Sequence, residues 1–249
     1  MNKSYNYKDF RIEILYEDSD IAILNKPSGL LTHKKNKFDN NPNLQESLNN
    51  QFIIYDDEEF KEGIVHRLDK DTSGIIIITK NINCKKKLKE MFKKRNIKKN
   101  YLAFTYGVMN KNNFEVNKNI SRNKFNRTKF NVSDELGKNA ITKVSNIKIF
   151  HGSISLLGCE IITGRTHQIR VHLLSLGLPI IGDKDYIFDK EQKFRMNNIS
   201  DDHKNLLLSF PRQALHSYKI EFDHPIIEKN IKITCDLPDD MKDLNKILQ

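Results

Sequence analysis

The segment Gly74 to Lys80, GIIIITK, constrains the fold of this chain more than any other. Its isoleucines form too short a run for a helix, and β-branched residues favour a strand that is buried on both faces. Such a strand needs partners on either side. We therefore expect the chain to fold around a sheet. Its 249 residues are enough to bury a hydrophobic core against that sheet.

Alternating apolar residues predict further strands before and after this run. Residues 11–24 indicate two strands around a turn at 17–20, because apolar residues recur at every second position before the turn. The later segments that predict strands are 101–108, 153–163, 219–222 and 229–235.

Helical spacing occurs between these strands. In residues 83–96 apolar side chains recur at i, i+4, i+7 and i+8 among lysines, which predicts an amphipathic helix with a basic face. Thr166 can cap a helix that reaches Leu176, and residues 44–54 can hold a short one.

The order of these elements predicts the fold class. We expect an α+β fold with a mainly antiparallel mixed sheet flanked by helices, forming a single domain over residues 1–249. Residues 34–43 and 188–205 are expected to be surface insertions, because they show little periodicity.

The charge balance points to a polyanionic partner. The chain has 42 lysines and arginines against 32 acidic residues, a net charge of +10. Basic residues gathered on one face would release counterions from phosphates, although a general abundance of lysine is the plain alternative. No apolar run approaches the roughly 18 residues of a membrane span, and no signal peptide is evident, so we expect a soluble, cytoplasmic protein.

The cysteines indicate neither a disulfide framework nor a zinc module. Cys84, Cys159 and Cys235 are far apart and form no CxxC pair. They are expected to fill the core or the surface.

The most informative polar segment is residues 66–74, HRLDKDTSG, which leads directly into the isoleucine run. Unpaired charge beside buried residues is costly, so a specific arrangement is expected, with a salt-bridged loop as the alternative. The segment is not a kinase catalytic loop, since a DFG motif and a glycine-rich loop are missing, and no Walker A or GxGxxG motif occurs.

A second polar segment, residues 164–173, has the sequence GRTHQIRVHL. His167 and His172 are five positions apart, about 140° around a helix, so they are not placed to hold one metal ion. Arginine and polar side chains near a helix N-terminus instead suit a carboxylate or a phosphate.

Together these segments resemble the RluA-type family of pseudouridine synthases. The other matching segments are NKPSGLLTH (25–33), Lys99 to Tyr101, GDKDY (182–186) and LHSYKIEFDHP (215–225). The resemblance covers nearly the whole chain in the family's order. It implies the pseudouridine synthase fold and an isomerase that converts specific uridines of ribosomal or transfer RNA to pseudouridine.

The resemblance also implies roles for individual residues. Asp69 would be the catalytic aspartate, Tyr101 the aromatic residue that stacks on the target uracil, and Arg170 the basic partner of the aspartate. Arg67 would enter the RNA stack when the target base leaves it, and Leu215 would form an apolar wall of the pocket. The remaining substrate-binding residues implied by the match are His66, Arg165 and Thr72.

The residue types suit this chemistry. The reaction breaks the N1 to C1′ bond, turns the base and rejoins it through C5 without net redox change, so no cofactor and no metal are expected. An ionised carboxylate can bond covalently to the sugar or the base, and a neighbouring arginine would favour the ionised form. The carbon attacked, and the option that Asp69 instead removes a sugar proton, stay open.

RNA is the expected partner, bound by a monomer and without a membrane. Several enzymes of the family carry an N-terminal S4 domain. Only about ten residues precede the first predicted strand here, so we expect that domain to be missing. The basic helix face at 85–94 and the stretch 122–129, which carries phenylalanines between its cations, are then expected to grip the RNA backbone.

Two other functions are consistent with parts of the sequence. A noncatalytic RNA-binding protein with this fold would not need the aspartate, the tyrosine and the arginine. A glycosidase or base-excising enzyme would use Asp69 and Asp71 as paired acids, but in an extended chain these side chains point to opposite faces.

Overall fold

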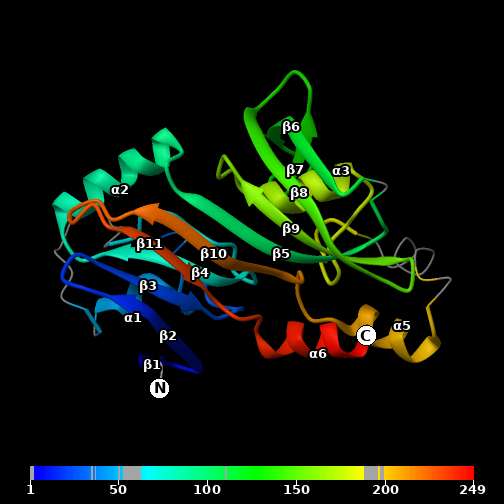
Figure 1. Cartoon of the computed structure of the whole chain (residues 1–249), viewed down its shortest axis with the longest axis horizontal. Helices are drawn as coiled ribbons and strands as arrows, with labels where there is room; N and C mark the ends of the chain where they lie inside the picture. The colour runs from blue at the N-terminus through cyan, green and yellow to red at the C-terminus, as the bar shows by residue number, and fades with distance from the viewer. Residues whose placement is uncertain are drawn as a thin grey trace. The chain divides into compact units, whose positions relative to one another are not determined.

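The computed structural model describes residues 3–34, 36, 38–49, 51–52, 63–109, 111–187, 196 and 199–249, and for residues 201 and 202 the backbone alone. The chain divides into two compact units, each assembled from separate segments (Figure 1). The first unit comprises Met1–Lys98 and Ser217–Asp236, and the second comprises Lys99–His216 and Leu237–Gln249. The single domain expected from the sequence stays a prediction.

The first unit is built on a sheet of six strands in the order β1-β2-β3-β4-β10-β11. The strands are β1 (Lys3–Tyr7), β2 (Phe10–Glu17), β3 (Ile21–Lys26), β4 (Ser73–Thr79), β10 (Leu215–Asp223), whose first two residues belong to the second unit, and β11 (Asn230–Thr234). The pairs β1/β2, β2/β3, β3/β4 and β10/β11 are antiparallel. The predicted strands at 11–24 are confirmed as β2 and β3.

The isoleucines of β4 are buried on both faces of the sheet, as the sequence predicts. Ile75 and Ile77 face helix α2 (Ile82–Lys94), which contributes Cys84 and Leu88 to their cluster. Successive strand residues point to opposite faces, so Ile76 and Ile78 are buried on the other side. Helix α1 (Leu44–Asn49) also belongs to this unit.

Helix α2 begins and ends with clear caps. The side chain of Asn81 accepts a hydrogen bond from Cys84 N at 2.8 Å, which satisfies one of the unpaired N–H groups of the first turn. Arg95 ends the helix in the left-handed conformation, with φ of 64°. The predicted amphipathic helix at 83–96 is thereby confirmed.

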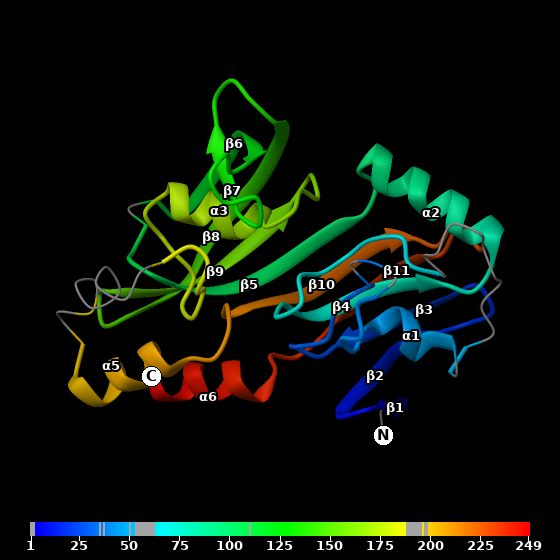
Figure 2. The same ribbon diagram turned by 180° about the vertical axis from the view of Figure 1, so that it is seen from behind.

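The second unit contains an antiparallel sheet in the order β5-β9-β8-β6-β7. Its strands are β5 (Lys98–Tyr106), whose first residue belongs to the first unit, β6 (Asn113–Arg122), β7 (Phe130–Ser133), β8 (Lys138–Phe150) and β9 (Ile154–Ile161). Its helices are α3 (Gln168–Ser175), α5 (Asp201–Ser209) and α6 (Asp239–Ile247). Helix α3 packs on the β6–β8 side of the sheet through Val171, which contacts Ile120 and Ala140 (Figure 2).

Strands β6, β7 and β8 were not predicted from the sequence. Their exposed positions hold mostly lysine and asparagine but also Phe114, Ile147 and Ile149, so apolar residues do not mark one face and the alternation is too weak to be recognised. The pairs β5/β9, β8/β9, β6/β8 and β6/β7 are antiparallel, like the four pairs named in the first unit, which confirms the predicted α+β class with a mainly antiparallel sheet.

Two local predictions are wrong. Helix α3 begins after His167, which is left-handed with φ of 55°, and no side chain caps the helix, so Thr166 is not the cap. The segment 188–205 is not wholly a surface insertion, because Met196 and Ile199 are buried and α5 begins at Asp201. Residues 188–195, 197 and 198 lie outside the described part of the chain.

Among the described residues, no helix has the length and apolarity that a membrane span requires.

Gly74 is required by backbone geometry where β4 begins. Its φ is +111°, and a Cβ atom there would lie 2.2 Å from Ser217 O of β10. Gly74→Ala should therefore lower the free energy of unfolding by more than about 2 kcal/mol, measured by urea unfolding, since it adds a steric clash to a strained conformation.

Gly29→Ala is the matched control in the same unit. Gly29 also has a positive φ, +83°, but among the described residues its Cβ would meet the Phe10 ring alone, at 3.5 Å from Cε1 and 3.8 Å from Cζ, which are ordinary contacts. Its loss should stay near the backbone cost of about 1–2 kcal/mol. Equal losses in both variants would show that the approach of β10 does not require glycine at position 74.

Candidate active site

The charged turn His66–Gly74, here called the aspartate turn, is held by a second turn that follows β3. Side-chain and backbone groups of residues 28–32 bind the backbone of residues 68–71. The bonds are Thr32 Oγ1 to Leu68 O (2.7 Å), Leu68 N to Thr32 Oγ1 (3.2 Å), Gly29 N to Lys70 O (3.0 Å) and Ser28 Oγ to Asp71 O (3.2 Å). The backbone on either side of Asp69 is thereby fixed.

Lys26, the last residue of β3, completes this clamp from inside the protein. Its side chain is fully buried, and Nζ donates to Pro27 O and Leu30 O at 2.8 Å each and to Lys70 O at 3.0 Å. An ammonium group has three donors, and these three carbonyls satisfy all of them. One buried cation therefore joins the turn after β3 to the aspartate turn.

Asp69 itself is partly buried at the centre of the held segment. Its carbonyl accepts a hydrogen bond from Thr72 N at 3.1 Å, which tightens the turn. Thr72 is buried and Arg67 is exposed. The clamp thus presents a carboxylate with little freedom in its backbone, beside an arginine that solvent can reach.

His66 anchors the start of the aspartate turn. Its Nε2 accepts a hydrogen bond from Ile77 N of β4 at 2.8 Å, and its ring lies 4.8 Å from the ring of Phe92 on α2. Because Nε2 accepts, the proton of the neutral ring is assigned to Nδ1. The four predicted residues His66, Arg67, Asp69 and Thr72 therefore come together in the first unit.

In the second unit, Arg170 on α3 is the centre of a buried ionic network. Its Nε and Nη2 donate to the two carboxylate oxygens of Asp183 at 2.7 and 2.6 Å, and Nη2 also binds Asp185 at 2.7 Å. The guanidinium stacks over the ring of Tyr186, 4.9 Å from its centroid. Arg170 is 5% exposed, so this bidentate and stacked geometry holds it in a single orientation.

The GDKDY segment (182–186) supplies all three of these partners. Gly182 has φ of +75°, and a Cβ there would lie 2.0 Å from Arg212 O. Tyr186 accepts a hydrogen bond from Phe130 N at 2.9 Å. Burial, opposed by that hydrogen bond and by Arg170, raises the pKa of Tyr186 to about 12, so its hydroxyl stays neutral. The segment was matched as a motif, but the sequence did not reveal its role as the holder of Arg170.

The polar residues around α3 are engaged by their own unit. His167 Nδ1 lies 2.7 Å from the Tyr186 hydroxyl, and His172 Nδ1 lies 2.9 Å from Thr142 Oγ1. Burial lowers the pKa of His172 to about 4, so it is neutral at physiological pH. Arg165 is exposed, and its Nε donates to Asn139 O at 3.1 Å.

Tyr101 and Leu215 are buried residues of the second unit. Tyr101 lies on β5 opposite Cys159 of β9. Lys99, on the same face of β5, is also buried, and this burial lowers its pKa to about 8. Leu215 begins β10, and its carbonyl accepts a hydrogen bond from Arg212 at 3.4 Å.

The predicted residues therefore form two groups, one in each unit. The second unit holds Tyr101, Arg165, Arg170 and Leu215. The residues that position these groups and that sequence reasoning missed are Lys26, Thr32, Asp183 and Tyr186. A lysine in the apolar run before a proline, and two aspartates beside a glycine turn, were the available signals.

The predicted basic face of α2 is smaller than its sequence suggests. Lys85 is buried, which corrects its assignment to that face. Lys94 pairs with Glu90 at 2.8 Å, and Lys87 Nζ donates to Pro225 O at 3.1 Å. Lys86, Lys89 and Lys93 are exposed.

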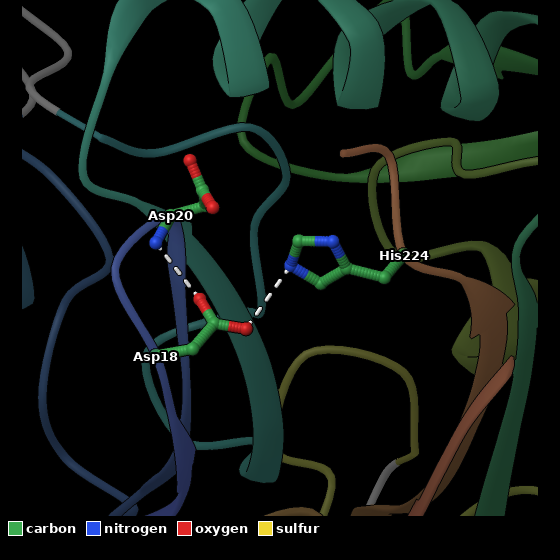
Figure 3. A group of neighbouring side chains, drawn as sticks. All are labelled: Asp18, Asp20 and His224. Atoms are coloured by element: carbon green, nitrogen blue, oxygen red, sulfur yellow. Dashed lines mark hydrogen bonds and ion pairs between the residues drawn. The ribbon is translucent and has the colours of Figure 1, made fainter. Parts of the chain in front are cut away.

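A group of carboxylates and a histidine occurs where the β2–β3 turn meets residue 224. Asp18 Oδ2 lies 3.1 Å from His224 Nε2, and Asp20 is beside it (Figure 3). His224 Nδ1 accepts from Ile226 N and Ile227 N at 3.2 Å each, so the ring proton is assigned to Nε2. A metal bound at Nε2 would place a proton on Nδ1, against these two donors.

Asp18 has little remaining capacity for a metal. Its Oδ1 accepts from Asp20 N and Ile21 N at 2.8 Å each, and its Oδ2 accepts from Tyr16 at 2.7 Å. Although burial raises the pKa of Asp18, these hydrogen bonds outweigh burial and lower it. The cluster therefore acts as a structural junction within the first unit.

Comparison with known proteins identifies the family. The model of the RNA pseudouridylate synthase family matches residues 20–175. Ribosomal large subunit pseudouridine synthase D of Borreliella burgdorferi is 39% identical over 215 residues, which is 85% of this chain and 61% of that protein. The protein of the same name from Buchnera aphidicola is 37% identical over 239 residues, 94% of this chain and 72% of that protein. The chain belongs to the RNA pseudouridylate synthase family, which confirms the predicted resemblance.

A solved structure supports the fold. Human RNA Pseudouridylate Synthase Domain Containing 4 aligns with a TM-score of 0.72 and 23% identity, covering 94% of this chain and 92% of that one. This likeness confirms the predicted pseudouridine synthase fold. The chain spans less than two thirds of the length of the Borreliella burgdorferi relative.

Removal of the Lys26 ammonium should loosen the aspartate turn. Lys26→Met removes this donor from the carbonyls of Pro27, Leu30 and Lys70, of which Lys70 O keeps its bond from Gly29 N, and a buried carbonyl left unsatisfied costs about 1–3 kcal/mol. We expect a lower free energy of unfolding in urea and faster hydrogen exchange at the amides of Leu68 and Thr72. Lys86→Met on the exposed face of α2 is the control and should change neither; unchanged exchange in Lys26→Met would contradict the clamp.

The two aspartates that bind Arg170 should differ in their contribution to stability. Asp183→Asn removes a buried charge and leaves the guanidinium poorly compensated, so a loss of about 3–5 kcal/mol in the free energy of unfolding is expected. Asp185 has a side chain that is 49% exposed, and Asp185→Asn should cost at most about 1 kcal/mol. Thermal and urea unfolding measure both, and a reversed order would refute this description of the network.

Proposed function

We propose that this chain converts uridine in RNA to pseudouridine. In this reaction the N1 to C1′ bond breaks, a C5 to C1′ bond forms, C5 loses its proton and N1 gains one, so atoms and electrons balance. The proposal rests on one observation above all: a chain of this family holds Asp69 in a turn whose flanking backbone is bound by Lys26 and Thr32. Such fixation of the backbone lowers the entropic cost of placing a reacting group.

Asp69 is proposed as the nucleophile. An ionised carboxylate can form a covalent bond to the sugar or to the base and leave again, which divides one difficult step into two easier ones. The reaction is an isomerisation without net oxidation, so we expect that neither a redox cofactor nor an energy source takes part. The residues on either side of Asp69 are held through their backbone carbonyls: Leu68 O accepts from Thr32 Oγ1 and Lys70 O accepts from Lys26 Nζ. This supports the role of Asp69.

Tyr101 and Arg170 are proposed to serve the same uridine. A tyrosine ring offers a flat face for the uracil, worth roughly 1–3 kcal/mol per stacked base. Arg170 is proposed to favour the ionised form of Asp69, and its fixed orientation on Asp183 supports a role that depends on position.

The proposed substrate contacts come from both units. Exposed Arg67 and Arg165 are suited to phosphates or to the gap left by an extracted base. Leu215 is proposed as an apolar wall of the pocket. His66 and Thr72 are proposed to act on the substrate through the aspartate turn, since His66 anchors that turn on Ile77 N.

Large-subunit ribosomal RNA is the proposed substrate. The relatives from Borreliella burgdorferi and Buchnera aphidicola are named for that RNA. The net charge of +10 is suited to any RNA, so transfer RNA is the alternative outcome of the test. We further propose that the protein acts as a monomer in the cytoplasm.

Asp69→Asn should abolish pseudouridine formation while RNA affinity stays within a few-fold, because the substitution keeps the shape and removes the nucleophile. The assay incubates the purified chain with large-subunit ribosomal RNA and, separately, with transfer RNA, and then maps pseudouridine in each. Retention of more than about a hundredth of the wild-type rate, equivalent to less than roughly 2.7 kcal/mol of barrier, would exclude Asp69 as the nucleophile.

Asp71→Asn is the matched control, two positions along the same turn. Its backbone carbonyl would still accept from Ser28 Oγ, so the turn should be preserved and activity should stay within about tenfold of wild type. An equal loss in the two variants, with release of free uracil by the wild type, would favour a base-excising enzyme. RNA binding without either product would favour a noncatalytic protein.

A further inference from the structure

The loop at the tip of the β6–β7 hairpin carries a phenylalanine whose side chain is not covered by any of the residues that the structure describes. Phe125 is 100% exposed. Burying a phenylalanine side chain is worth roughly 1.5–3 kcal/mol, so a ring left entirely in water is available for a partner. The loop between the strands, Asn123–Lys129, is here called the hairpin tip.

The hairpin tip is ordered by its own hydrogen bonds. Asn123 Oδ1 accepts from Phe125 N at 2.8 Å and Asn126 N at 2.9 Å, and Asn126 Oδ1 accepts from Thr128 N at 3.0 Å. Asn123 N also donates to Lys129 O at 2.9 Å. Asparagine side chains that bind the backbone two residues on stabilise turns. The exposed ring therefore stands on a preorganised loop, which lowers the entropic cost of binding.

The charged residues next to Phe125 in the sequence all have one sign. Residues 122–131 contain four cations and no acidic residue. Lys124 and Arg127 lie on either side of Phe125 in the sequence and are exposed, and the guanidinium of Arg122 lies 5.5 Å from the ring centroid of Phe130. An aromatic face between cations matches a polymer that alternates flat bases with phosphates, whereas an apolar protein pocket would gain nothing from the cations.

The base of the hairpin is tied to the holder of Arg170. Phe130 N donates to Tyr186 at 2.9 Å, and Lys129 Nζ donates to the carbonyl of Asp185. Tyr186 in turn stacks under the guanidinium of Arg170. A nucleotide bound at the hairpin tip would thus be held at a fixed position relative to Arg170.

From this we infer that Phe125 stacks on an unpaired base of the substrate RNA while Lys124 and Arg127 bind the adjoining phosphates. The inference rests on the proposed action on RNA and adds a docking point to it. Phe125 is a positioning residue in this assignment, because its ring lies on the docking loop and takes no part in bond breaking.

Tryptophan fluorescence tests the stacking directly, since the chain contains no tryptophan. Phe125→Trp introduces a single indole at the hairpin tip, and its emission should be quenched when single-stranded RNA of mixed sequence is added. Leu136→Trp is the control, because Leu136 is an exposed apolar residue beside Asp134 and Glu135. Quenching that is absent, or equal in the two variants, would overturn the inference, as would a change in emission with protein concentration alone.

Affinity measurements separate stacking from charge. Phe125→Ala should weaken RNA binding by about 5- to 150-fold without changing the dependence on salt, and Phe125→Trp should bind at least as well as wild type. Arg127→Gln should instead reduce the log-log salt slope by about 0.7. Leu136→Ala should match wild type, and all variants should keep the wild-type unfolding midpoint because the substituted side chains are exposed. Wild-type affinity in Phe125→Ala would refute the stacking role.

The outcome for Phe125 is distinguishable from the outcome for the enzyme. If wild type forms pseudouridine and Phe125→Ala binds RNA and turns over equally well, the docking point is wrong and the proposed function stands. If wild type binds RNA through Phe125 but forms no pseudouridine, the docking point stands and the proposed function fails. Absence of RNA binding by wild type would overturn both.

Discussion

The buried ammonium of Lys26 is the interaction on which the candidate active site depends. Taking an ion out of water costs several kcal/mol, and the cost is recovered only if every donor finds an acceptor. The three carbonyls that accept from Lys26 belong to the turn after β3 and to Lys70 of the aspartate turn. The lysine is therefore stable in the core only when both turns are in place, so the position of Asp69 is coupled to the folding of the first unit.

Arg170 is a second buried cation, in the second unit, and different groups compensate its charge. Its planar guanidinium is matched by the paired oxygens of Asp183, by Asp185 and by the ring of Tyr186. Three neutral carbonyls converge on the single nitrogen of the Lys26 ammonium, whereas two carboxylates bind the Arg170 guanidinium at its nitrogens and the Tyr186 ring stacks against its face. A lysine at position 170 would lose the bidentate and stacked contacts, and an arginine at position 26 would not fit three converging carbonyls.

The basic residues of the protein differ in how well they are placed to bind RNA. Of the lysines on α2, one is buried, one pairs with Glu90 and one binds a backbone carbonyl. The hairpin tip has fewer cations, but it contains no acid, and its loop is fixed by Asn123 and Asn126. Placement therefore distinguishes a candidate RNA contact from solvated charge better than the total of +10 does.

Local patterns in the sequence were enough for β2, β3, β4 and α2, because the side chains that define them recur at spacings of two or of three to four residues. The motif around Asp69 and the motif around Arg170 were also recognisable, since each is a contiguous segment. Sparse patterns failed: β6 to β8 expose lysine and asparagine at so many positions that their alternation is weak.

Only the tertiary structure decided how these local elements are held. Lys26 and Lys70 are 44 positions apart, and Phe130 and Tyr186 are 56 apart, yet each pair shares a hydrogen bond. Periodicity carries no information about such pairs, because they depend on which turns the sheet brings together and on which buried polar groups still need a partner. For the same reason the sequence identified Asp69 and Arg170 as charged candidates but not the residues that hold them. The fold determined that Lys26 binds the turn that carries Asp69 and that Asp183 orients Arg170.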